Sequence, residues 1–451
     1  QDDLLLGPVS NPFLLPQGVN NTYWDKSYFS TYATTDTVDV ASLTGTVTLR
    51  TESSPNSGAA TPLLQVWLQN VDLLGLSTST KTIANFQPWV ETTETSIVPF
   101  LTLDALQPAS LEVTAFSGDI NLVGNLTLSP SPKGTISLLA AGSLNGLQPD
   151  GTANNNSAVT WSSSTIDLSD ADPSAIPGFD SPYAYENEVG TNPAASKTTG
   201  GFIRINGVST AVSLGFGFIN NLFAESGSTE GIYGVLQTKQ ELHASIDNAP
   251  LHASDPVPVR LYASSGDISG ITLFAGKQSR VVAGQDITDI ALYIQNDNPG
   301  DVSLVAAGRD IVAYNANAPL LVAAQAAGNI LDFGQGALAG DIQIAGPGTL
   351  EVLAGRNLNL GDGPNNSDGT GVGISSMGNQ GNPVLPFAGA DIVSAAGLTD
   401  TPQYNAFISE FLTPGTALGD RYLPELGMLL GTPDATEAAI QMAFDALSSD
   451  Q

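Results

Sequence analysis

A short pattern of apolar and polar positions recurs along much of the chain. An apolar, β-branched run leads to Ala or Ser, then Gly, then Asp or Asn, and then Ile or Leu. One copy is Leu304-Val-Ala-Ala-Gly308-Arg-Asp310-Ile311, and a later copy spans residues 353–358. Segments such as 350–354 alternate between inward and outward positions, as strands do. The pattern therefore predicts short β-strands joined by tight corners.

The spacing of the repeat matches one coil of a β-solenoid. Gly284, Gly308, Gly328 and Gly355 are separated by 24 (284 to 308), 20 (308 to 328) and 27 (328 to 355) residues. We expect each Gly to supply a positive φ and each following Asp or Asn to bond the neighbouring backbone. A β-sandwich with turn glycines is the alternative. The predicted corner residues are Gly118, Asp119, Gly266, Asp267, Gly284, Asp286, Gly308, Asp310, Gly328, Asn329, Gly355 and Asn357.

The repeat divides the chain into five parts. Residues 1–50 are expected to form a Pro/Asn-rich strap and a first strand, and 51–147 the first solenoid coils. Residues 148–256 lack the repeat and predict a loop-rich insertion packed on the shaft. Coils return over 257–398, and 399–451 is expected to be a helical cap. The predicted fold class is all-β.

Two helices are expected in the C-terminal part. Apolar residues fall at helical spacing over 404–412, after Thr401-Pro402. A second helix should start near Thr432-Pro433, where Ile440, Ala443, Phe444 and Leu447 form one stripe. The chain stops just beyond that stripe, so we expect the natural polypeptide to continue.

Composition narrows the function classes. The 44 acidic and 13 basic residues give a net charge of −31, which would repel nucleic acids. The chain has no cysteine, which excludes disulfides and thiolate metal sites. No apolar run approaches the roughly 18 residues of a transmembrane helix.

Several side-chain groups could carry chemistry. Asp362, Asn366 and Asp368 lie among glycines and offer oxygen ligands for calcium, with a solvated turn as the alternative. We expect no other cofactor and no catalytic residue. Weaker groups are Asp167, Asp170 and Asp172, the histidines His243 and His252, and the tryptophans Trp24, Trp67, Trp89 and Trp161, for which loop, surface or packing roles are the alternative.

The repeats resemble the filamentous haemagglutinin family of two-partner secretion exoproteins. The resemblance rests on segments 286–293, 307–314, 361–373, 116–124 and 388–392, and it covers about four-fifths of the chain, from about Trp89 onward. It implies a right-handed parallel β-helix, an outer-membrane transporter as partner, and secretion from, or display on, a Gram-negative cell. It implies no enzyme.

The expected function is that of a structural or adhesive exoprotein, a rigid rod for attachment, matrix or filament building. A glycan or protein of a host or matrix would be its ligand, and copies could join end to end. One alternative is a carrier shaft for a downstream effector. Another is a polysaccharide-cleaving β-helix enzyme, which would need concentrated positive charge, whereas Arg280, Arg309 and Arg356 lie on separate coils.

Overall fold

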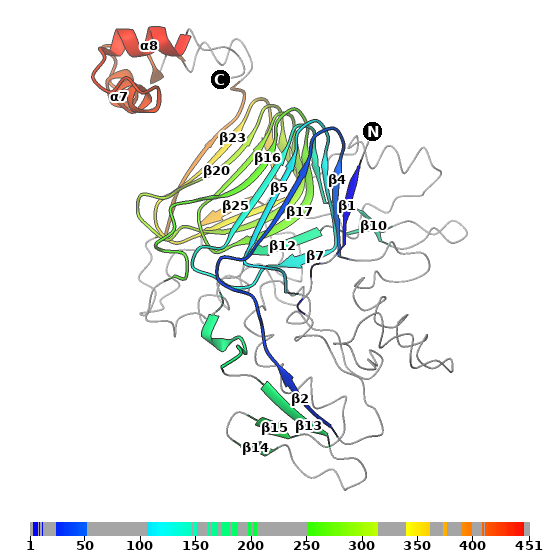
Figure 1. Cartoon of the computed structure of the whole chain (residues 1–451). Helices are drawn as coiled ribbons and strands as arrows, with labels where there is room; N and C mark the ends of the chain where they lie inside the picture. The colour runs from blue at the N-terminus through cyan, green and yellow to red at the C-terminus, as the bar shows by residue number, and fades with distance from the viewer. Residues whose placement is uncertain are drawn as a thin grey trace, which may run out of the picture.

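The computed structural model describes part of the chain in detail. The described residues are 3–7, 9, 11, 24–51, 106–146, 148–150, 160–162, 164–168, 171, 173–180, 183–187, 197–199, 202–204, 250–313, 340–360, 373–376, 389–398, 408–409 and 411–445. Most of their strands belong to two large sheets that lie alongside each other (Figure 1). Every strand pair in both sheets is parallel, so the all-β prediction is confirmed and the antiparallel β-sandwich is excluded.

The first large sheet has eight strands in the order β26-β23-β20-β18-β16-β8-β5-β3. Its strands are β3 Thr37–Ser42, β5 Ser110–Ala115, β8 Thr135–Ala140, β16 Val259–Ala263, β18 Ser279–Ala283, β20 Val302–Ala307, β23 Thr349–Ala354 and β26 Asp391–Ala395. Neighbours in this sheet follow one another in the order of the sequence.

The second large sheet has twelve strands, and its main path is β1-β4-β6-β9-β17-β19-β21-β24. These strands are β1 Leu4–Leu6, β4 Val47–Arg50, β6 Ile120–Val123, β9 Leu144–Asn145, β17 Ile268–Ala275, β19 Ile287–Gln295, β21 Ile311–Val312 and β24 Leu358–Asn359, with β7 Asn125–Thr127, β12 Ser164–Leu168, β22 Asp341–Ala345 and β25 Gly373–Ser376 off the main path. The chain passes repeatedly from the eight-stranded sheet to this one and back.

Smaller elements complete the described structure. They are the antiparallel pair β10 Gln148–Asp150 and β11 Thr160–Ser162, the four-stranded sheet of β2 Trp24–Tyr28, β13 Tyr183–Asn187, β14 Lys197–Thr199 and β15 Phe202–Arg204, a 3-10 helix at Pro173–Ala175, and the helices α7 Gly419–Leu429 and α8 Glu437–Asp445.

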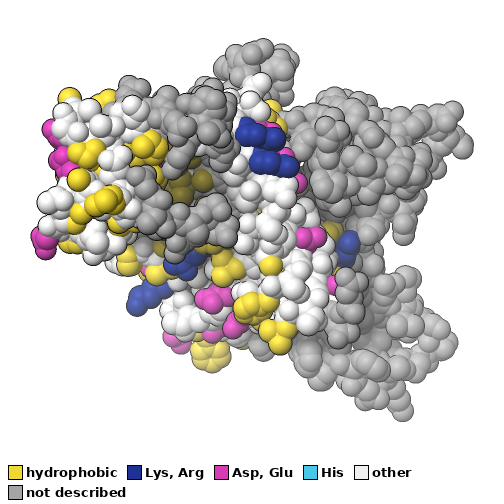
Figure 2. Space-filling view, turned by 90° about the horizontal axis from the view of Figure 1, so that it is seen from above, with side chains coloured by type: hydrophobic (Ala, Val, Ile, Leu, Met, Phe, Trp, Pro, Cys, Tyr) yellow, Lys and Arg dark blue, Asp and Glu magenta, His cyan; other side chains and the backbone are white. Residues whose placement is uncertain are grey.

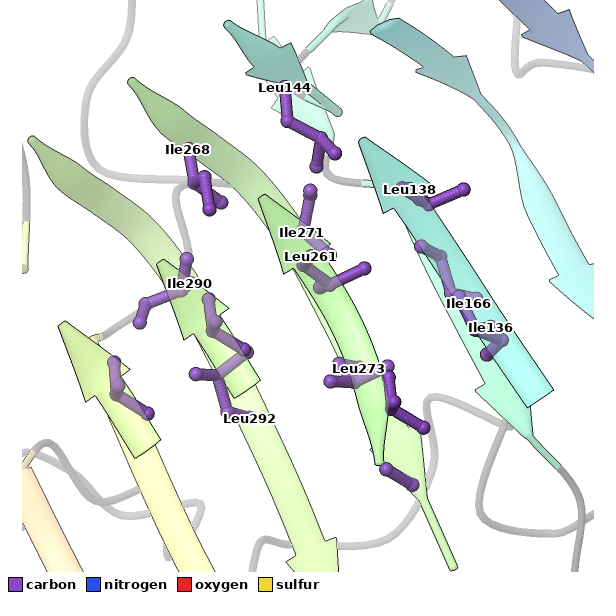
Figure 3. Packing of buried hydrophobic residues seen from close by; sticks show 14 of the residues in the cluster. Ile136, Leu138, Leu144, Ile166, Leu261, Ile268, Ile271, Leu273, Ile290 and Leu292 are labelled. Carbon is purple, nitrogen blue, oxygen red and sulfur yellow. The ribbon is translucent and has the colours of Figure 1, made fainter. Parts of the chain in front are cut away.

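The core consists of rows in which one inward side chain lies over the next. In the eight-stranded sheet one such row is buried in the seven strands from β3 to β23, and it contains Val40, Val113, Leu138, Leu261, Val281, Val305 and Val352. Figure 3 shows Leu138 and Leu261 of this row packed with Ile271 and Leu273 of the twelve-stranded sheet. Each fully buried side chain of this kind contributes about 1.5–3 kcal/mol, which makes the rows the main stabilising feature.

The corner glycines are required for close approach, and the positive-φ explanation was wrong for them. Gly118, Gly266, Gly284 and Gly308 do not have positive φ. A Cβ on Gly118 would lie 2.5 Å from the carbonyl oxygen of Gly45 in the adjacent coil, and the other three glycines have similar conflicts. Successive coils lie about 4.8 Å apart, which leaves no room for a side chain at this point.

Positive φ instead occurs where the twelve-stranded sheet bends. Gly270 has φ 71°, and it separates residues 268–269, which pair with β9, from residues 271–275, which pair with β12. Asp289, at φ 53°, occupies the equivalent bend of β19. Asp is one of the few non-glycine residues that adopts this conformation readily.

Replacing Gly308 by Ala should therefore destabilise the chain by about 2 kcal/mol, because the new methyl group overlaps the Gly284 carbonyl oxygen. Gly300→Ala is the matched control, since no atom lies within 4 Å of its Cβ position. Urea unfolding of both variants measures the difference. Equal stability of the two variants would contradict the close-approach explanation.

The coil predicted around Gly328 does not separate the coils of Gly308 and Gly355. Strand β20 pairs directly with β23, and the Gly355 amide donates a hydrogen bond to the Ala307 carbonyl at 2.9 Å. The step between these two corners is therefore 47 residues (308 to 355), twice the expected length. Gly328 and Asn329 lie outside the described residues.

The sheets also extend beyond the predicted boundaries. Strand β12, at 164–168 in the predicted insertion, lies between β7 and β17 in the twelve-stranded sheet. Strands β1, β3 and β4, which fall within the predicted N-terminal part, belong to the two large sheets. These segments lack the Gly-Asp corner, so only their inward residues, such as Ile166 and Val47, mark them as coil strands.

The two C-terminal helices pack on each other around Leu412, Leu423 and Ile440, and Figure 1 shows them apart from the sheets. Residues 391–394 of the last strand, β26, are exposed, so the expected cap does not cover this edge. Helix α8 falls where the second helix was expected. Helix α7 was not predicted, because it contains Pro424 and two glycines. Of the first predicted helix, 404–412, residues 404–407 and 410 lie outside the described residues, and residues 408, 409 and 411 are helical.

Candidate functional site

A ladder of hydrogen bonds follows the corner between the two large sheets. Each acidic side chain in it accepts a hydrogen bond from a backbone amide of the next coil. In each described hydrogen bond the backbone amide of the first residue donates to Oδ1 of the second. The pairs are Ser143 to Asp119 (2.7 Å), Asp286 to Asp267 (2.9 Å), Asp310 to Asp286 (3.1 Å) and Asn357 to Asp310 (3.1 Å). The feature that recurs at the corners is therefore a hydrogen bond from a backbone amide of one coil to an acidic side chain of the adjacent coil, which explains why Asp follows the corner Gly.

Two arginines also donate hydrogen bonds to acidic side chains of this ladder. Arg309 donates to both carboxylate oxygens of Asp286, at 3.0 and 2.5 Å, and Arg356 donates to both oxygens of Asp310, at 3.2 and 2.6 Å. The hydrogen bond to Asp286 raises the pKa of Arg309. Partial burial opposes ionisation of Asp310, but hydrogen bonds from Arg356 and Asn357 outweigh it and lower its pKa. Both guanidinium groups are therefore engaged within the shaft.

A buried cation lies at the start of β18. The Lys277 side chain is 1% exposed, and its Nζ lies 2.7 Å from Asp255 Oδ2 and donates to the Gly134 carbonyl at 2.7 Å. Burial lowers the pKa of Lys277, and the hydrogen bond that Lys277 donates to Asp255 only partly offsets this effect. Burial opposes ionisation of Asp255 as well, but Lys277 and the Val257 amide together lower its pKa. This pair joins two coils and is inaccessible to a ligand.

Strands β19 and β22 of the twelve-stranded sheet are buried on both faces. All nine residues of β19 are buried, and Phe274 stacks on Tyr293 with ring centroids 4.8 Å apart. Asp341 is 4% exposed and accepts a hydrogen bond from Gln343 Nε2 at 3.2 Å. Burial raises the pKa of Asp341 to about 7 and raises that of Tyr293 as well. These buried strands therefore offer no open surface to a ligand.

The outer face of the eight-stranded sheet is accessible, and it consists of two outward rows. All members of both rows are exposed or half-buried. The charged row contains Asp39, Glu112, Ser137, Arg260, Arg280, Leu304, Glu351 and Val393; the apolar row contains Ala41, Thr114, Leu139, Tyr262, Val282, Ala306, Leu353 and Ala395. Figure 2 shows that basic side chains on the visible face gather in a few small groups.

Arg260 and Arg280 differ from the corner arginines. They pair directly across β16 and β18, and Tyr262 lies two positions beyond Arg260 on the same face. Neither arginine takes part in any of the described hydrogen bonds or ion pairs. The alternation in each strand predicts that both side chains point outward, but only the register brings them together.

The residues selected from the sequence are not assembled into a site by the described structure. Asp362, Asn366 and Asp368 lie outside the described residues, as do Asp170, Asp172, His243, Trp67 and Trp89, and only the backbone is described at Trp24 and Trp161. Asp167 and His252 are buried. Within the described ranges, no group of three His, Asp or Glu side chains is arranged to hold a metal ion.

Comparison with protein-family models, with curated proteins and with solved structures finds no match for this chain. In the described part of the chain, neither helix has the length and apolar character needed to span a membrane.

Proposed function

We propose that this chain is part of a secreted or surface-displayed structural or adhesive exoprotein, built as a right-handed parallel β-helix. The chain alternates between two parallel sheets, so each return to a sheet is a crossover between parallel strands. Such crossovers are right-handed in nearly all known cases. The glycine corners and the Asp ladder support the same arrangement, because they repeat with the coils.

The observation that carries this function is the accessible outer face. Eight parallel strands present two continuous rows of outward side chains on a rigid backbone, supported from below by a buried row. A flat surface of this type suits contact with a macromolecule or an extended glycan. We therefore assign attachment, matrix or filament building to this face.

Export through an outer-membrane transporter of a Gram-negative cell is the route that fits this proposal. The chain has no cysteine, so an unfolded chain could pass through a pore without disulfide formation. The resemblance of the Gly-Asp repeats to filamentous haemagglutinins supports the same route. A protein or glycan of a host or matrix would be the ligand.

A second candidate function is that of a carrier shaft for an effector further along the polypeptide. The helices α7 and α8 have their own apolar cluster and stand apart from the sheets, as a junction to a further domain would. A polysaccharide-cleaving enzyme is less favoured, because Arg309 and Arg356 are already bonded to Asp286 and Asp310.

The location can be tested with an antibody against the purified chain. The antibody should label intact cells of the producing bacterium or detect the protein in the medium, while a cytosolic marker stays inside. Beads coated with the chain should then attach to matrix proteins or glycans without releasing reducing sugar ends. Labelling seen only after cell lysis would refute export, and release of sugar ends would support the enzyme.

A further inference from the structure

We propose that the outer face of the eight-stranded sheet binds a second copy of this chain, so that two stacks lie side by side and run in opposite directions. This association goes beyond the proposed function, and it requires only the observed register of the sheet, whether or not the protein is an adhesin. Four observations on the two outward rows lead to it.

The first observation is the order of charges. Along the first five strands, the charged row reads Asp39, Glu112, Ser137, Arg260 and Arg280. Two acidic residues are thus followed by one neutral residue and two basic residues. This order becomes its own complement when it is reversed, because each acidic position then meets a basic one.

The second observation is that a simple rotation produces this match. A two-fold axis parallel to the strands, passing above Ser137, reverses the stacking direction and keeps the strand direction. Asp39 of one copy then faces Arg280 of the other, Glu112 faces Arg260, and Ser137 faces its own equivalent. The same surface is used by both copies, as a closed two-fold dimer requires.

The third observation is that the apolar row obeys the same axis. Leu139 of one copy faces Leu139 of the other, Thr114 faces Tyr262, and Ala41 faces Val282. These side chains are half-buried or exposed in the single chain and carry no formal charge. Their burial would add an apolar contribution beside the two kinds of ion pair.

The fourth observation is that, among the residues that the structure describes, no acidic side chain forms an ion pair with Arg260 or Arg280. Adjacent strands are about 4.8 Å apart, and one neutral strand separates Arg260 from Glu112 and Arg280 from Glu351. Two positive charges in direct cross-strand pairing repel each other, which is unfavourable unless an acidic partner is supplied. A second copy supplies two acidic partners, Asp39 for Arg280 and Glu112 for Arg260.

The size of the overlap predicts a weak dimer. Five strands span about 24 Å, and six residues of each strand span about 20 Å, which gives on the order of 500 Å² per copy. This is less than the roughly 800 Å² per partner of a standard stable interface. At about 0.15 M salt, the long-range repulsion between two chains of charge −31 is largely screened, whereas contact pairs persist.

Sedimentation velocity over chain concentrations up to about 100 μM tests the proposal in a range suited to a transient interface. The chain should form a dimer, and Arg280→Glu should weaken dimerisation about tenfold or more, because Asp39 then faces a carboxylate. The double variant Asp39→Arg/Arg280→Glu should restore dimerisation. Arg421→Glu, on helix α7, is the control for net charge and should have no effect.

A cross-linking experiment locates the interface independently. The chain has no cysteine, so Ser137→Cys introduces a single thiol at the proposed axis. A short bis-maleimide should link two Ser137→Cys chains efficiently, but it should link Glu351→Cys chains poorly, since Glu351 lies on the same row beyond the overlap. A chain that stays monomeric, a dimer unaffected by Arg280→Glu, or equal cross-linking at both positions would overturn the proposal.

Discussion

Replacing Asp255 by Asn is expected to lower the free energy of unfolding by about 3–5 kcal/mol, the usual range for a buried ion pair that loses one partner. The variant leaves the Lys277 ammonium 1% exposed and without its carboxylate at 2.7 Å. The Gly134 carbonyl remains as an acceptor, but it carries no full negative charge. Chemical denaturation at neutral pH measures the loss.

The double variant Asp255→Asn/Lys277→Met distinguishes a buried charge from lost packing. Removing the ammonium removes the main cost, so the double variant should recover most of the stability lost by Asp255→Asn. Asp391→Asn, in the exposed strand β26, is the control and should change stability by less than about 0.5 kcal/mol. A double variant as unstable as the single one would show that Asp255 acts through something other than Lys277.

Replacing Asp341 by Asn is expected to stabilise the chain at about pH 8 by on the order of 4 kcal/mol. Burial raises the pKa of Asp341 from 3.8 to about 7. As pH rises between these values, the unfolded chain releases the proton while the folded chain still holds it. Stability of the wild type therefore falls across this window, and above pH 7 the full cost of ionising the buried carboxyl applies.

The difference between the two proteins should depend on pH in a defined way. At about pH 5 the wild type folds with Asp341 protonated, so the advantage of Asp341→Asn should shrink by more than half. This pH remains above the isoelectric point of about 4.1. Urea unfolding of both proteins at several pH values gives the difference in their free energies of unfolding. The contributions of the other carboxylates cancel in this difference, because both proteins contain them. A constant difference across the window would show that Asp341 is not the titrating group.

The sequence predicts the local structure of the stack well. Alternation of apolar and polar residues in segments such as 350–354 identifies the strands. A Gly followed directly, or after one residue, by Asp or Asn marks the corners between them. The stripe containing Ile440 and Phe444 identifies helix α8. These features depend on residues close together in the chain, so the side-chain pattern is sufficient to predict them.

The candidate site was not predictable in the same way. Arg260 and Arg280 are 20 residues apart, and their alternation predicts only that both point outward. The charge order of the outer row depends on Ser137 pairing with Arg260, although more than 100 residues separate them. Side chains on neighbouring strands meet according to register, and register across a long insertion is set by packing of the whole stack.

The sequence by itself predicted short β-strands joined by repeated Gly and Asp corners and determined the strongly acidic balance, but it left a β-sandwich open as the alternative to a stack of parallel strands. Only the tertiary structure decided that the corner glycines serve close approach, that the Gly308 corner meets the Gly355 corner, and that β12 joins the sheet. It also decided that Lys277 and Asp341 are buried. The reason is physical: strand and turn preferences act over a few residues, whereas burial and contact between coils depend on which distant segments are brought within about 5 Å of each other.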